Sequence, residues 1–206
     1  KVPFLSDAQL ESAAQELLRR YAKWKGEPPR PPIPVDAIAE GVLGLTLEMN
    51  DLRKKLGKSD VLGATWLDDA LVVIDSSLEG NEGRYSFTLG HELGHWQLHR
   101  PLREMDKVTF PLFSREPGEK AGPAIVCRDG QRDPAEIQAD KFSAFLLMPA
   151  SDVRAAVKQV TGEPLAIDNL AARKKAGDRI AELRRVAAEV IAKGGFSNVS
   201  NQAMQI

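Results

Sequence analysis

The stretch FTLGHELGHWQLHRP, residues 87–101, contains all three histidines of this 206-residue chain. Its pattern predicts a helix over residues 83–99 that ends before Pro101, because a proline disfavours helical backbone in the residue that precedes it. On such a helix His91 and His95 are four positions apart and share one face. Their Cβ atoms would lie about 5 to 6 Å apart, so both imidazoles could reach a single metal ion.

A glutamate completes the pattern His-Glu-x-x-His. Glu92 is one position round the helix from His91, so its carboxylate could reach a water on the ion without being a ligand. The simpler alternative is that the histidines line a buried helix face and bond to backbone carbonyls. The complete pattern, on a helical segment that follows predicted strands, favours the metal site.

A third ligand is needed, because a catalytic zinc normally has three protein ligands and one position for water. Four residues are candidates: His99, Cys127, Glu136 and Asp140. His99 is eight residues past His91, about 12 Å along a straight helix, so one ion could not contact both. We interpret His99 as a structural histidine near a helix C-terminus, where positive charge is favoured. Cys127 could be an inhibitory fourth ligand, but a lone cysteine is more often a small buried hydrophobe.

Glu136 and Asp140 lie on a second predicted helix, which Asp133 and Pro134 begin and which ends at Met148. Because they are four apart, one carboxylate could bind the metal while the other accepts a hydrogen bond from a ligating histidine. Alternatively, Glu136 completes the cap begun by Asp133. An apolar face should bury this helix, and buried carboxylates need compensation, so we expect Glu136 as third ligand with Asp140 behind it. The residues of that face are Ile137, Phe142, Phe145 and Leu146.

The remaining segments predict an α+β fold. Ser6 and Gln9 form a capping-box pattern for a helix of about four turns, which ends before the proline-rich segment 26–34. Two or three antiparallel strands should precede the histidine helix, and the last two should form a hairpin. These strands are Leu43–Met49, Val61–Leu67 and Ala70–Ser76, and a further short strand is expected at Ala124–Arg128 inside a long loop, 101–132.

The chain beyond residue 150 is expected to be helical, and the composition changes there. We therefore predict one domain over 1–150, which contains the candidate metal site, and a helical segment over 151–206. The expected helices are 151–160, 167–176 and 178–193, the last capped by Gly194 and Gly195.

Composition excludes several classes of function. The formal net charge is −1, so no overall basic field points to nucleic acid or anionic lipid. Residues 151–206 hold nine Lys or Arg against six Asp or Glu, an excess too small to argue for DNA binding. One cysteine, no apolar run of roughly 18 residues and no apolar signal segment together predict a cytoplasmic protein that uses no membrane.

The chain resembles the ImmA/IrrE family of zinc metallopeptidases. The resemblance rests on FTLGHELGHWQLH and on E-x-Q-A-D-x-F-x-A-x-L-L-M-P at 136–149, and more loosely on 34–49 and 61–75. It implies a minimal thermolysin-like zincin core, in which an active-site helix packs against a small antiparallel sheet. It also implies that His91, His95 and Glu136 are ligands and that Glu92 is the base.

The ending KGGFSNVSNQAMQI resembles the helical, helix-turn-helix-like unit that can follow this core. Members of the family typically cleave a helix-turn-helix repressor and so derepress stress or mobile-element genes. The resemblance thus implies a zinc-dependent endopeptidase with a protein substrate, and Tyr85 is its one suggested oxyanion stabiliser. Manganese or another divalent ion could replace zinc at such a site. The alternative is a metal-bound regulatory module that binds a repressor or DNA without proteolysis.

Overall fold

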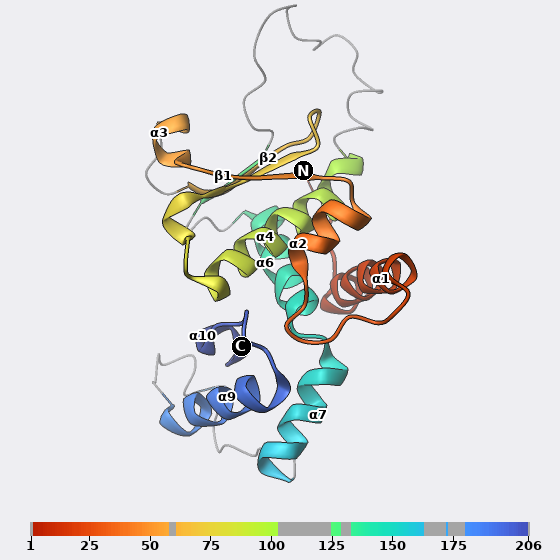
Figure 1. Cartoon of the computed structure of the whole chain (residues 1–206), viewed down its shortest axis with the longest axis vertical. Coiled ribbons are helices and arrows are strands. Elements are labelled where there is room, and N and C mark those ends of the chain that lie inside the picture. Colours follow the sequence, from red (N-terminus) through yellow and green to blue (C-terminus); the bar gives the residue numbers. More distant parts are fainter. Residues whose placement is uncertain are drawn as a thin grey trace, which may run out of the picture.

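The computed structural model describes residues 2–57, 61–102, 125–128, 133–162, 172 and 180–205, with residues 125–128 described only as backbone. It shows a mixed α and β chain, compatible with the predicted α+β class, in which a four-stranded sheet lies over a layer of helices (Figure 1). The elements in chain order are α1 (Asp7–Lys25), α2 (Val35–Ala37), the π-helix η1 (Ile38–Val42), β1 (Thr46–Asn50), α3 (Leu52–Leu56), β2 (Val61–Trp66), β3 (Leu71–Asp75), the 3-10 helix η2 (Ser76–Leu78), α4 (Glu82–Gly94), the π-helix η3 (His95–His99), β4 (Ile125–Arg128), α6 (Pro134–Leu147), α7 (Ala150–Thr161), α9 (Ala181–Gly194) and α10 (Asn201–Met204).

Helix α1 begins and ends as its sequence predicts. Ser6 and Gln9 form the capping box, in which the Gln9 amide donates to Ser6 Oγ and the Ser6 amide donates to Gln9 Oε1. Gly26 ends the helix in the left-handed conformation, at φ 87°. The buried side of α1 packs against α6 and consists of Leu10, Ala14, Leu17, Leu18 and Tyr21.

The sheet has the strand order β1-β3-β2-β4. Strands β2 and β3 form the predicted antiparallel hairpin, and β4 confirms the short strand expected near residues 124–128. The prediction that all these strands are antiparallel is wrong, because β1 runs parallel to β3. After β1 and α3 the chain returns in the opposite direction as β2, and the hairpin then inserts β3 between β1 and β2. Alternation along a strand encodes its faces but not its direction relative to its neighbours.

The histidine helix is longer and less regular than predicted. Its α-helical part, α4, passes into η3 at His95, and helical backbone then continues through Pro101 to residue 102. The expectation that Pro101 ends the helix is therefore wrong. In η3 the Arg100 amide donates to the carbonyl of His95, five residues back. This wider turn suits a following proline, whose ring clashes with the carbonyl four residues back in a regular α-helix.

Two glycines let α4 and α6 approach each other closely. A Cβ atom on Gly90 would lie 2.5 Å from Ser143 Oγ, and one on Gly94 would lie 3.1 Å from Ala139 Cα. Any larger side chain at these positions would push the helices apart. The two glycines therefore set the spacing of the two helices that carry the predicted ligands.

Helix α6 has the predicted bounds but not the whole predicted face. Asp133 caps it by accepting the amide of Ala135 at 2.8 Å. Phe142 and Leu146 are fully buried, whereas Ile137 is 44% exposed, which corrects its assignment to the apolar face. Ile137 and Leu146 are nine residues apart, about two and a half turns, so they lie on opposite sides of the helix.

The described residues beyond 150 pack onto the rest of the chain. Helices α7 and α9 match two of the three predicted helices, and Gly195 caps α9 at φ 73°. The expected helix 167–176 lies outside the described residues, apart from position 172. Phe196 and Val199 belong to the same buried cluster as α1, α4 and α6, and Asn198 Nδ2 donates to the carbonyl of Ile33. The division of the chain at residue 150 stays a prediction.

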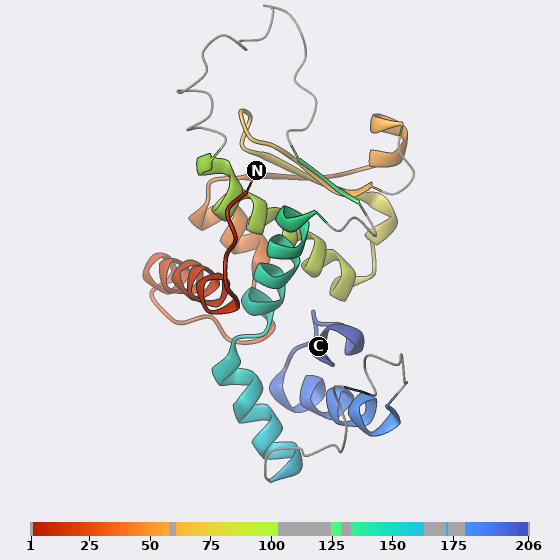
Figure 2. The same ribbon diagram turned by 180° about the vertical axis from the view of Figure 1, so that it is seen from behind.

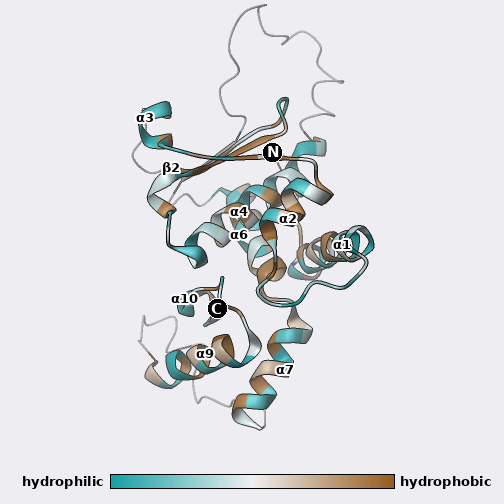
Figure 3. Ribbon diagram, viewed as in Figure 1, coloured by the Kyte–Doolittle hydropathy of each residue, from teal (hydrophilic) through white to brown (hydrophobic). Residues whose placement is uncertain are grey.

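Hydropathy follows this arrangement. In Figure 3, α3, which packs against the central strands β2 and β3, is largely hydrophilic, whereas hydrophobic residues occur along the strands and on α4 and α6. Among the described residues, no helix combines the length and apolar character needed to cross a membrane.

Candidate metal centre

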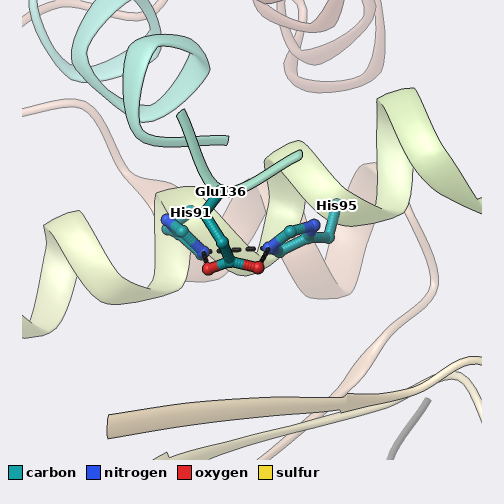
Figure 4. Close-up of side chains that lie close together, drawn as sticks. All are labelled: His91, His95 and Glu136. Atoms are coloured by element: carbon teal, nitrogen blue, oxygen red, sulfur yellow. Dashed lines mark hydrogen bonds and ion pairs between the residues drawn. The ribbon is translucent and has the colours of Figure 1, made fainter. Parts of the chain in front are cut away.

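Three of the predicted site residues meet at one point. His91 and His95 come from the α4–η3 helix and Glu136 comes from the first turn of α6 (Figure 4). Glu136 Oε2 lies 3.2 Å from His91 Nε2, and Oε1 lies 3.3 Å from His95 Nε2. The two Nε2 atoms are 2.9 Å apart, and the three candidate ligand atoms all lie within 4.8 Å of one another. This group could hold a metal ion.

The alternative role considered for Glu136, completion of the helix cap, is not what the structure shows. The Asp133 carboxylate caps the helix through Ala135, while the Glu136 carboxylate lies between the two imidazoles. Oε2 of Glu136 is buried and has no hydrogen-bond donor among the described residues. A buried carboxylate oxygen without a donor is costly, and a cation at this point would compensate it. The donor set thus fits a divalent metal ion.

Asp140 lies behind His91, where the sequence places it. Its Oδ1 is 2.8 Å from His91 Nδ1, although the carboxylate side chain is 56% exposed. Since an ionised carboxylate can only accept, His91 donates from Nδ1, and the neutral ring then carries its lone pair on Nε2. That lone pair points to Glu136, as a metal ligand requires.

The ionisation of His95 and Glu136 also suits a metal. Burial is the main reason that the pKa of His95 is lowered to about 4. Burial alone would raise the pKa of Glu136, but its contacts with His91 and His95 outweigh this effect and lower that pKa to about 2. These pKa directions favour a neutral imidazole at His95 and an ionised carboxylate at Glu136 at neutral pH, the forms that bind metal ions.

Glu92 is wholly buried beside this group, with an exposed fraction of 0%. Thr65 Oγ1 of β2 donates to its Oε2 at 2.5 Å, and its Oε1 has no partner among the described residues. Burial raises the pKa of Glu92 to about 7, although the nearby His91 and the Thr65 hydroxyl act to lower it. An acid with a pKa near the working pH can both accept and return a proton.

Strand β2 supplies two residues that the sequence reasoning missed. A Cβ atom on Gly63 would lie 2.7 Å from Glu92 Oε1, so this glycine makes the space for the carboxylate. Gly63 and Thr65 are two apart and therefore share one face of the strand. A glycine inside a strand signals close approach of another group, and this signal could have pointed to both residues.

His99 lies outside the group of three candidate ligands. It is buried, with Nδ1 2.9 Å from His95 Nδ1 and Nε2 3.0 Å from Gln138 Oε1. His99 is thus a buried histidine outside the candidate ligands, as the sequence predicts, but burial lowers its pKa and so disfavours the positive charge expected near a helix C-terminus. Cys127 lies in β4, and its side chain is outside what the structure describes.

Tyr85 has a different contact from the one suggested for it. Its hydroxyl donates to Asp36 Oδ1 of α2 at 2.5 Å, and burial with this contact raises the pKa of the hydroxyl. The structure therefore gives no support to an oxyanion role for Tyr85.

A scan against models of known protein families finds no match for this chain, and a search of curated proteins finds no significant sequence match. The resemblance to the ImmA/IrrE family thus rests on the motifs quoted above.

Proposed function

We propose that the chain is a metal-dependent endopeptidase, and that α4, η3 and α6 with the sheet form a minimal thermolysin-like zincin core. The observation that carries this proposal is the buried carboxylate of Glu92. It follows the first candidate ligand directly, it is held through one oxygen by Thr65, and its other oxygen lacks a partner among the described residues. A purely structural metal site needs no such carboxylate.

His91, His95 and Glu136 would hold the ion. Two imidazoles and one carboxylate are a ligand set that zinc takes in peptidases, and manganese could also occupy it. When bound, zinc would acidify a water molecule and polarise the carbonyl of the peptide bond.

Glu92 would move the proton. Its Oε1 accepts a proton from the attacking water while Thr65 keeps Oε2 in place, and the protonated carboxyl then delivers that proton to the leaving amine nitrogen. A pKa near 7 favours both halves of this transfer at neutral pH. Asp140 keeps His91 in the tautomer that a ligand needs.

The substrate class that we propose is a helix-turn-helix repressor of stress or mobile-element genes. Support for this class comes from the pair of motifs and the ending that resemble the ImmA/IrrE family.

The test is cleavage of a candidate repressor encoded beside the gene for this chain. The zinc-loaded protein should yield discrete fragments in a gel, and mass spectrometry should identify one new amino terminus. The control is Glu92→Gln, which should bind zinc as wild type does and yield no fragments. A stable intact complex with wild type would instead favour the regulatory module, and ready digestion of casein would refute a narrow specificity.

A further inference from the structure

A chain of buried contacts leads away from His95 on the side opposite to Glu136. His95 Nδ1 lies 2.9 Å from His99 Nδ1, and His99 Nε2 lies 3.0 Å from Gln138 Oε1. Gln138 Nε2 then donates to the backbone carbonyl of Pro3 at 2.7 Å. His95, His99 and Gln138 are all buried, so water does not offer them alternative partners.

The direction of every hydrogen bond in this series follows from the last acceptor, the carbonyl of Pro3. A carbonyl oxygen only accepts, so the amide nitrogen of Gln138 must face Pro3 and the amide oxygen must face His99. That oxygen also only accepts, and His99 must therefore donate from Nε2. A neutral imidazole has a single N–H, which leaves Nδ1 of His99 as an acceptor for Nδ1–H of His95.

We infer that His99 and Gln138 are positioning residues, which hold His95 in the Nδ1–H tautomer so that its Nε2 lone pair faces the metal position. This inference rests on the proposed metal-dependent function. Asp140 of α6 does the same for His91. The unusual feature is that a second histidine, rather than a carboxylate or a backbone carbonyl, accepts the hydrogen bond from His95.

The opposite direction is unfavourable at both ends of the chain. If His99 donated to His95 from Nδ1, its Nε2 lone pair would face the oxygen of Gln138, and two acceptors would meet at 3.0 Å in a buried place. His95 would then carry its hydrogen on Nε2, the atom that a metal must contact. The contact between Gln138 and Pro3 therefore selects the tautomer that can bind metal.

The series of hydrogen bonds ends at Pro3, in the segment before α1, which is 135 residues away from Gln138 in sequence. In the view from behind, this segment runs beside α6 (Figure 2). Lys141 of α6 also pairs with Asp7 at the start of α1, at 2.6 Å. The N-terminal segment thus contributes to the geometry of a site that lies in the middle of the sequence.

The first measurement needs no variant. In the Zn²⁺-loaded full chain with ¹⁵N-labelled histidine at pH 7.5, long-range ¹⁵N–¹H spectra should show the hydrogen of His95 on Nδ1 and that of His99 on Nε2. A His99 hydrogen found on Nδ1 would overturn the inference.

The second measurement is the dissociation constant for Zn²⁺, by competition with a chromophoric chelator. His99→Phe and Gln138→Leu should bind Zn²⁺ about 10- to 100-fold more weakly, the usual effect of losing such a partner. His99→Gln should recover part of the loss, because its amide oxygen can accept from His95. Gln97→Ala is the matched control in the same π-helical turn, since Gln97 contacts Arg20, and it should bind as wild type does.

A Zn²⁺ dissociation constant within threefold of wild type for both His99→Phe and Gln138→Leu would also overturn the inference. Failure of the proposed function gives a different result. If wild type binds Zn²⁺ and the variants weaken that binding, but no repressor or casein is cut, the positioning role stands and the peptidase proposal falls. If wild type binds no Zn²⁺, both fall.

Discussion

The spacing of α4 and α6 should depend on Gly90, and a double-mutant cycle with Ser143 can measure this dependence. In Gly90→Ala the new Cβ atom would lie 2.5 Å from Ser143 Oγ, well inside van der Waals contact. Ser143 Oγ cannot turn away without loss, because it donates to the carbonyl of Phe87 at 2.8 Å. The alanine must therefore displace either this hydrogen bond or the helix.

The expected free energies have opposite signs. Overpacking a core costs about 1 to 3 kcal/mol, while alanine in place of glycine favours a helix by about 1 kcal/mol. Gly90→Ala should thus lower the free energy of unfolding by up to about 2 kcal/mol. Ser143→Ala should cost about 1 kcal/mol, because it removes one hydrogen bond.

In the Ser143→Ala background the clash with Oγ is removed, and the nearest remaining atom of residue 143 is Cβ, a tight contact at 3.3 Å. Gly90→Ala should then be neutral or stabilising by up to about 1 kcal/mol, which makes the coupling free energy about 1 to 3 kcal/mol. The assay is urea unfolding of the metal-free protein, followed by far-UV circular dichroism. If the two changes add to within about 0.5 kcal/mol, the reasoning about close helix approach is refuted.

Three further predictions concern the site. Thr65→Val should lower kcat of cleavage by about 10- to 100-fold, because a hydrogen bond to a charged group is worth about 1.5 to 3 kcal/mol, whereas Thr65→Ser should keep most of it; equal kcat for both variants would contradict this role. Glu92 has a folded pKa of about 7, above its usual 4.5, so its ionisation destabilises the metal-free fold as pH rises through that range. Glu92→Gln should therefore stabilise the metal-free protein more at pH 8 than at pH 5 in urea unfolding, and a difference of the opposite sign would exclude the buried charge. Zn²⁺ at 100 times the wild-type dissociation constant should raise the free energy of unfolding of wild type by about 2.7 kcal/mol, and EDTA should reverse this gain. The same gain in Glu136→Ala at the same Zn²⁺ concentration would remove Glu136 from the ligand set.

Local chemistry made much of this structure predictable from sequence. The capping box of Ser6 and Gln9 and the Asp133-Pro134 start act within one helical turn, so their effect does not depend on the rest of the fold. The spacing of His91 and His95 is equally local. The approach of Glu136 to these histidines depends on a second helix. It was predictable only because Glu136 and Asp140 share one face of a helix that the sequence predicts to be buried.

The features that sequence reasoning missed depend on contacts between distant segments. The parallel direction of β1 and β3 results from the insertion of β3 between β1 and β2, which no alternation pattern encodes. The sequence predicts that His99 lies near a helix C-terminus where positive charge is favoured, whereas the fold buries it against Gln138 of another helix. Thr65 matters only because β2 lies beside Glu92, 27 residues further along the chain.

The repeated pair Gly-His at 90–91 and 94–95 explains how one short segment determines both the packing and the site. Each glycine is a position where α6 approaches closely, at Ser143 for Gly90 and at Ala139 for Gly94. Each histidine is the next residue, about 100° further round the helix, and therefore projects beside the contact rather than into it. Because the two helix backbones lie so close together, the side chain of Glu136, in the first turn of α6, is long enough to reach both imidazoles. The same glycines that allow the helices to pack thus bring the third candidate ligand within reach of the first two.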